Sequence, residues 1–433
     1  MSTAPVAYAS SLQTELQKEA ESNTEGSQTE TSQPETSQSE TPATETETSQ
    51  PETKPELETR QTETAAADYA SNIIAGNSVY LGELSSEYGI SFDEEFEKTM
   101  DKIEADYKEF LDKPEDFLAE NWQDVLAVYV MKYGQDAGIK MDKSCRDDLE
   151  QIFFLMNVRS NSAILRKLEK IQKEEVSETE GRSAETEKAA EAEESTETKK
   201  AADAEESTET KKVAETDAKE YRALSVQDYI ALYGADEEQT AILEKYTSTK
   251  CRQLCAIVTA SKGFVRSEAG SDVSEERVSI VAAACSLIGK VGYFWGGKSY
   301  AIGWDDSWGS PMTVSAEGSK SSGTVRSYGL DCSGFVAWSY YNGLGGKDAG
   351  IGNHTTTQWN ASEMVDSQSA RPGDLVFYHP ASAGDDNHVG IVVGVNDNGS
   401  LLVVHCSSSQ NGVMTGEAWS AGFQYVRSPL GLE

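Results

Sequence analysis

The chain has 433 residues and a formal net charge of −37, with 74 Asp and Glu against 37 Lys and Arg. Acidity of this size argues against nucleic acids and anionic membrane surfaces as partners, because their phosphates repel it. No apolar run reaches the roughly 18 residues that a membrane-spanning helix needs, so we expect no membrane span. The six cysteines are too few for a disulfide framework in a chain long enough for two or three domains.

The N-terminal residues 1–67 are a near-repetition of Thr, Glu, Ser, Gln and Pro. Such a segment buries too little apolar surface to offset the entropy lost on ordering, so we expect it to be disordered. It serves either as a spacer or as an acidic tail without a specific task. Residues 7–10 (Ala-Tyr-Ala-Ser) resemble the cleavage site of a secretory signal, but no basic and apolar regions precede them. We therefore expect a secreted protein whose signal peptide is missing from this sequence.

Residues 68–172 predict a small helical domain. Ser91 and Glu94 have the spacing of a capping box, and apolar residues follow it at helical intervals. Pro114 suits the first turn of a second helix, which ends at Gly134, and Ser144 suits the cap of a third. The aromatic residues of these helices predict a core rather than a ligand site.

An acidic linker over residues 173–220 separates this region from further helices. In the linker, residues 189–200 recur at 201–212 with one Glu-to-Asp change, and the composition predicts a disordered or partly helical segment. Residues 221–265 then predict capped helices, which either complete the domain of 68–172 or form a separate helical segment. Cys251 and Cys255 have the spacing of a metal pair, but no further ligand lies near them in the sequence. We therefore expect buried thiols and no metal site, and nothing in the chain predicts a cofactor.

The last segment, 272–433, predicts helices followed by an antiparallel sheet, which is an α+β fold. A helix after Ser274 leads into Tyr293-Phe294-Trp295-Gly296-Gly297, and a second helix starts near Cys332. Two strands, 388–395 and 401–405, flank the turn signal 396–399 (Asn-Asp-Asn-Gly). If those four turn residues form the loop, Val395 faces Ser400 and His388 faces Ser407.

This hairpin register brings two histidines together and places them opposite a cysteine. His405 lies one diagonal step from His388 on the same face, within side-chain reach. Gly390 and Gly394 share that face and leave room for the Cys332 helix to approach. A helix N-terminus lowers the pKa of a thiol, so the pattern predicts a Cys332 nucleophile, a His388 base and His405 orienting the base.

Five motifs in one order carry a family resemblance: Tyr-x-Trp-Gly-Gly (293–297), Asp-Cys-Ser-Gly-Phe (331–335), Pro-Gly-Asp-Leu-Val-Phe (372–377), His-Val-Gly-Ile (388–391) and His405. Together they resemble the NlpC-type bacterial cell-wall cysteine peptidases. The resemblance covers the C-terminal third and implies a papain-like fold that cleaves peptidoglycan stem peptides between D-glutamate and a diamino acid. It implies a secreted or cell-wall-associated protein.

The resemblance also implies roles for residues around the nucleophile. Tyr293 and Asp331 match positions that hold the free amine of the L-alanine of the stem peptide, and Ser333 and Trp295 complete the candidate substrate-binding set. The stretch 298–330 is longer than in compact members. We expect Asp374, Cys285 and Cys406 to be structural, and His354 to be a solvated loop residue rather than part of the cleft.

Three alternatives stay open for the function. The scaffold also suits an N-acetylmuramoyl-L-alanine amidase or an acyltransferase, although an amine-binding site favours a stem peptide already freed from glycan. The third is a non-catalytic wall-binding protein, against which the Cys-His-His set argues.

Overall fold

The computed structural model describes residues 82–134, 138–160, 162–173 and 221–432. The predictions for 1–67 and for nearly all of 173–220 therefore fall outside the described residues. No helix among the described residues is long and apolar enough to span a membrane.

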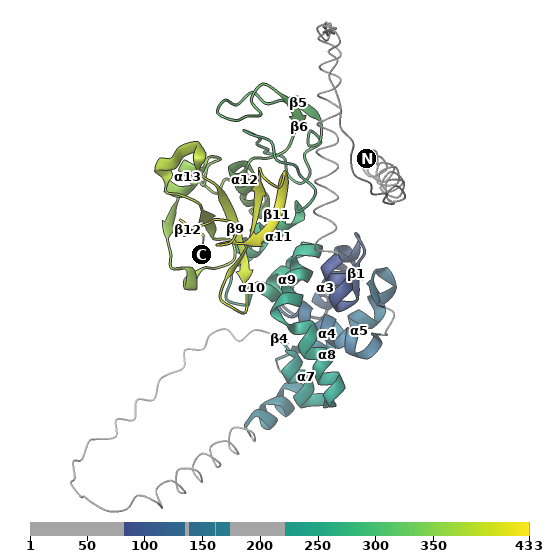
Figure 1. Ribbon diagram of the computed structural model, residues 1–433. Helices are drawn as coiled ribbons and strands as arrows, with labels where there is room; N and C mark the ends of the chain where they lie inside the picture. Colours follow the sequence, from purple (N-terminus) through teal and green to yellow (C-terminus); the bar gives the residue numbers. More distant parts are fainter. Residues whose placement is uncertain (1–81, 135–137, 161, 174–220, 433) are drawn as a thin grey trace, which may run out of the picture.

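Helices from both sides of the 174–220 gap pack into one helical region (Figure 1). Two small sheets connect it: a parallel pair of β1 and β2, and an antiparallel pair of β3 and β4 that joins the two sides of the gap. Its elements are α3 (Phe96–Lys108), α4 (Trp122–Tyr133), α5 (Arg146–Met156), α7 (Val226–Tyr233), α8 (Glu237–Thr247), α9 (Thr249–Thr259), α10 (Lys262–Ala269), β1 (Ile90–Phe92), β2 (Ile139–Met141), β3 (Asn157–Arg159) and β4 (Tyr221–Ala223).

Three helix starts in the first half differ from the prediction. Ser91 does not cap a helix, because it belongs to β1, and α3 begins only at Phe96. Pro114 opens a separate short 3-10 helix, and α4 begins later, at Trp122. Ser144 does not cap α5, because it lies in a short 3-10 helix (Lys143–Cys145) that Asp142 caps by accepting from the Ser144 N–H. By contrast, the predicted caps Ser225, Asp236 and Ser274 each accept from a backbone N–H of the third helical residue.

The C-terminal part is a six-stranded antiparallel sheet packed against two helices, which confirms the predicted α+β class. The strand order is β11-β10-β9-β8-β12-β7, and α12 lies against β9 and β10. Its elements are α11 (Glu275–Ser286), α12 (Cys332–Gly343), α13 (Thr355–Asn360), β7 (Ser362–Met364), β8 (Leu375–Phe377), β9 (Val389–Val395), β10 (Leu401–Ser407), β11 (Gly412–Glu417) and β12 (Tyr425–Pro429).

Helices α11 and α12 approach each other closely at Gly343. A Cβ atom at this position would lie 2.5 Å from the Cα of Ile280 in α11, closer than real Cβ contacts. Glycine at the end of α12 therefore lets the helix that begins with Cys332 pack directly on its neighbour.

The β9–β10 hairpin contains a bulge that the sequence did not predict. Next to the turn, Leu401 pairs with Val395, one residue off the expected register, and Leu402 pairs with Gly394. The next pair is Val403 with Val392, so β9 contains one extra residue between these two pairs. From Val392 towards His388 the strands therefore pair in the expected register.

The bulge separates two glycines that were predicted to share a face. A Cβ on Gly390 would touch His405, whereas a Cβ on Gly394 would lie 2.5 Å from the Glu268 carboxylate. Gly390 therefore makes room for a histidine and Gly394 for helix α10, and neither makes room for the Cys332 helix as we expected.

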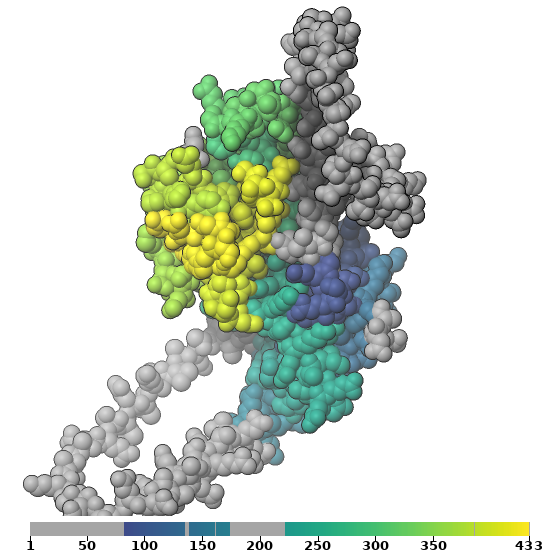
Figure 2. Space-filling view, viewed as in Figure 1, coloured from purple at the N-terminus to yellow at the C-terminus, as the bar shows by residue number. Residues whose placement is uncertain are grey.

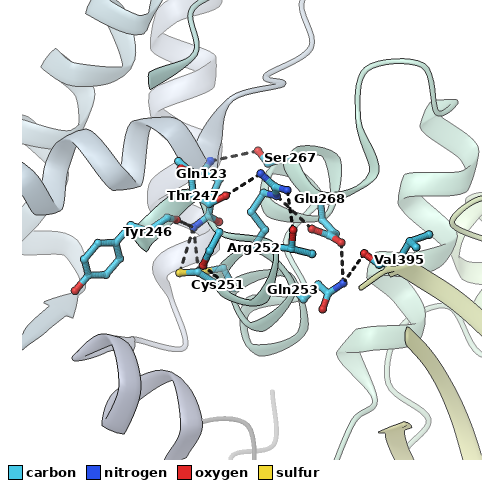
Figure 3. Close-up of polar contacts among 12 residues, drawn as sticks. Gln123, Tyr246, Thr247, Cys251, Arg252, Gln253, Ser267, Glu268 and Val395 are labelled. Atoms are coloured by element: carbon cyan, nitrogen blue, oxygen red, sulfur yellow. Dashed lines mark hydrogen bonds and ion pairs between the residues drawn. The ribbon is translucent and has the colours of Figure 1, made fainter. Parts of the chain in front are cut away.

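The helical region meets the sheet through α9 and α10, which lie between them (Figure 1). The Gln253 side-chain amide donates to the Glu268 carboxylate and to the Val395 carbonyl oxygen, both at 3.2 Å (Figure 3). The Arg252 guanidinium lies 3.5 Å from the same carboxylate, which is 4% exposed. Buried apolar residues from both parts also form one continuous core. This interface holds the helical region against the sheet.

Candidate active site

Cys332 is the first residue of α12, and Asp331 caps the helix by accepting from the Gly334 N–H at 2.6 Å. The predicted lowering of the thiol pKa is wrong for this structure. Burial raises the pKa of Cys332 to about 12, and the Asp331 charge adds to the rise. The Val389 N–H and the Lys298 ammonium oppose it more weakly. At neutral pH the resting group is a thiol, because desolvation outweighs the helix dipole.

The side chains of the two predicted histidines contact each other: His388 directly precedes β9, and His405 lies in β10. His388 Nε2 lies 2.7 Å from His405 Nδ1. Burial lowers the pKa of His388 to about 3, with the His405 ring adding to the effect, and burial lowers the pKa of His405 to about 4. Both rings are therefore neutral at neutral pH, and one ring donates a hydrogen bond to the other.

Two aromatic side chains hold the His388 ring in place. Phe423 stacks on it, with ring centroids 5.4 Å apart and an interplanar angle of 21°. The centroid of the Tyr378 ring lies 4.8 Å from that of His388. The Tyr378 hydroxyl donates to the Ala421 carbonyl at 2.6 Å, which fixes that ring in turn. Neither residue was predicted, because their proximity to His388 depends on strand order.

A cavity of about 600 Å³ opens beside the cysteine and the first histidine. Six of the predicted residues line it: Tyr293, Trp295, Asp331, Cys332, Ser333 and His388. The seventh, His405, does not line the cavity and is only 4% exposed. It lies behind His388, which separates it from the cavity. His354 is exposed, as predicted, but it also lines the cavity, so the prediction that it lies outside the cleft is wrong.

Lys298 forms an ion pair with Asp331, the residue that the resemblance assigned to binding a substrate amine. Its ammonium donates to both Asp331 carboxylate oxygens at 2.6 Å and to the Ser333 hydroxyl at 2.8 Å. Beside this ion pair, burial raises the pKa of the Tyr293 phenol, and the neighbouring acidic groups Cys332 and Asp331 raise it further. The phenol therefore stays neutral at physiological pH. Sequence reasoning missed Lys298, although it directly follows the Tyr-x-Trp-Gly-Gly motif.

The long stretch 298–330 forms one wall of the site. It contains the hairpin of β5 (Pro311–Thr313) and β6 (Val325–Ser327), which lies at the upper end of the coloured part of the chain in Figures 1 and 2. The Trp295 indole N–H donates to the Glu317 carbonyl at 2.8 Å, and both residues line the cavity. The stretch 298–330 therefore borders the cavity next to Trp295.

The residues predicted to be structural lie in the core. Asp374 accepts from the Arg277 guanidinium at 2.8 Å, and each side chain is only 2% exposed. Cys285 and Cys406 are also buried, and neither lines the cavity.

The predicted thiol pair Cys251 and Cys255 is buried against a glutamine. The Gln123 side-chain amide donates to both sulfur atoms, at 3.5 and 3.8 Å. Across the parts of the chain that the structure describes, no group of three or more His, Cys, Asp or Glu side chains has the arrangement of a metal site.

Comparisons with known proteins agree with the resemblance. Residues 290–426 match the model of the NlpC/P60 family. The chain is similar to the solved NlpC/p60 domain of the peptidoglycan hydrolase SagA, with 25% identity over 35% of this chain and 97% of that one (TM-score 0.25).

It is also similar to the peptidoglycan hydrolase RipB from Mycobacterium tuberculosis, with 25% identity over 46% of this chain and 88% of that one (TM-score 0.26). A third similar structure is RipD from the same organism, a non-catalytic NlpC/p60 domain protein adapted to peptidoglycan binding, with 21% identity over 36% of this chain and 98% of that one (TM-score 0.25). The comparison with curated proteins gave no match.

Proposed function

We propose that this chain, whose residues 290–426 form an NlpC/P60 domain, is a cell-wall hydrolase that cleaves peptidoglycan stem peptides through Cys332. The proposed bond joins D-γ-glutamate to the diamino acid, and the proposed location is outside the cell or in the wall. The observation that carries the proposal is the cavity that contains Cys332 and His388, with His405 hydrogen-bonded behind His388.

The reaction follows from the protonation states of the resting groups. Because the thiol and the imidazole are both neutral, His388 acts as a general base during attack rather than holding a preformed thiolate. As His388 Nε2 faces His405, its Nδ1 is the atom that takes the thiol proton. His405 is the positioning residue that accepts from Nε2–H and stabilises the imidazolium that forms.

The proposed chemistry then runs through a thioester. Cys332 Sγ attacks the γ-glutamyl carbonyl, and the tetrahedral intermediate collapses as imidazolium protonates the leaving amine of the diamino acid. The Cys332 backbone N–H, at the first turn of α12, is the proposed oxyanion donor. Water, deprotonated by His388, hydrolyses the thioester and regenerates the thiol.

An N-acetylmuramoyl-L-alanine amidase is the second candidate, since one observation favours it. Lys298 fills the site of Asp331 that would otherwise recognise a free L-alanine amine, so a stem peptide still joined to glycan fits as well. Digestion of purified muropeptides by the full chain, followed by mass spectrometry, separates the two. The endopeptidase leaves L-Ala-D-Glu on the sugar, whereas the amidase releases the entire stem.

A further inference from the structure

Lys298 and Asp331 form a short ion pair inside the cavity, next to the nucleophile. The ammonium contacts both carboxylate oxygens and the Ser333 hydroxyl, and the side chains are only 23% and 11% exposed. Ser333 Oγ also donates to Asp331 at 3.0 Å. Both carboxylate oxygens of Asp331 and the Ser333 hydroxyl therefore already have a partner within the chain.

The lysine is held along its length. The Tyr328 hydroxyl donates to the Lys298 carbonyl at 2.5 Å, and the Asp331 N–H donates to the neighbouring Gly297 carbonyl at 3.1 Å. The Lys298 stem crosses the first turn of α12 at Gly334, where an added Cβ would lie 3.0 Å from Lys298 Cδ. The ammonium position is therefore built by the fold and differs from that of a solvated surface lysine.

We propose that Lys298 determines the specificity of this subsite by taking the place of the substrate amine. The subsite then prefers stem peptides whose L-alanine nitrogen is acylated, as it is when the peptide is still joined to the glycan strand. A free ammonium would meet the like charge of Lys298 and would have to share the Asp331 carboxylate with it, which disfavours it. This inference rests on the proposed function.

The rest of the subsite suits a neutral acyl amide. The Tyr293 phenol lines the cavity in its neutral form and can pair with an amide group without a charge. On the same cavity, Trp295 supplies apolar surface against which the acyl group can pack. The subsite therefore offers a neutral partner and an apolar wall to the acylated end of the peptide.

The test compares two matched substrates with the full chain: the tripeptide L-Ala-γ-D-Glu-diamino acid with a free amine, and the same tripeptide N-acetylated. Lysine and meso-diaminopimelate versions are both used. The wild type is expected to cleave the acetylated peptide about tenfold better in kcat/KM, the size of one lost charge-assisted hydrogen bond. Lys298→Met frees Asp331, so the preference should shift towards the free amine by at least about tenfold. Lys298→Arg keeps the cation and should keep the wild-type preference.

Binding of the uncleaved peptides to a Cys332→Ala background, measured by calorimetry, gives the same ratio without turnover. A wild type that prefers the free amine, or a folded Lys298→Met variant with an unchanged ratio in both assays, would overturn the inference. Failure of the proposed function gives a different result, because the wild type then cleaves neither peptide. Binding to the Cys332→Ala protein still shows in that case whether acylation improves binding.

Discussion

The most informative perturbation of the site is the replacement of His405, because it acts only through His388. The 2.7 Å contact joins His388 Nε2 to His405 Nδ1, and both rings are buried. His405→Ala leaves a buried N–H without its acceptor, which costs about 1–3 kcal/mol. Expressed in kcat/KM, this is a loss of about five- to 150-fold.

His405→Asn should lose less activity than His405→Ala, since its side-chain oxygen is a smaller but usable acceptor. Cys332→Ala and His388→Ala remove the nucleophile and the base, so neither should show detectable turnover. The assay is kcat/KM on a stem tripeptide for the wild type and all four variants, with folding checked by thermal melts. A folded His405→Ala enzyme with wild-type kcat/KM would refute the reasoning and reduce the site to a Cys332–His388 dyad.

Three further predictions concern buried titratable groups. Because the pKa of Cys332 is raised to about 12, its alkylation by iodoacetamide should accelerate about tenfold per pH unit from pH 6 to 9, and a rate independent of pH would instead reveal a resting thiolate. Asp374→Ala leaves Arg277 as an uncompensated buried charge and should destabilise the fold by about 3–5 kcal/mol in thermal or urea unfolding, unlike the exposed control Asp306→Ala. Burial raises the pKa of Glu268 from its usual 4.5 to about 7, so the folded state favours the protonated carboxyl group. The free energy of unfolding is therefore highest below about pH 4.5 and falls by about 3 kcal/mol as the pH rises through 7. Glu268→Gln should flatten that part of the stability profile, and parallel profiles for the two proteins would contradict it.

Local patterns predicted the elements that carry the candidate chemistry. The start of α12 near Cys332 follows from a short-range signal, and the period of two in the hairpin correctly placed His405 beside His388. The bulge in β9 did not spoil this prediction, because it lies between the turn and the histidines. It did move Gly394 to a different neighbour, Glu268, which the period of two could not reveal.

The features that escaped prediction depend on contacts between distant segments. Ser91 pairs with Lys140 across the parallel β1–β2 ladder, and this pairing overrides its capping-box spacing. The raised pKa of Cys332 reflects burial by the assembled sheet, which no short sequence window contains. Lys298 reaches Asp331 only because the backbone folds back on itself at Gly297, whose carbonyl accepts from Asp331.

The central claim, hydrolysis of stem peptides by the Cys332 thiol, is tested most directly by mass spectrometry of muropeptides incubated with the full wild-type chain and with Cys332→Ala. The account predicts that the wild type releases fragments cut between D-glutamate and the diamino acid. It predicts that a folded Cys332→Ala protein releases none of them. The account would be contradicted by intact muropeptides after incubation with the wild type, or by equal cleavage with the two proteins.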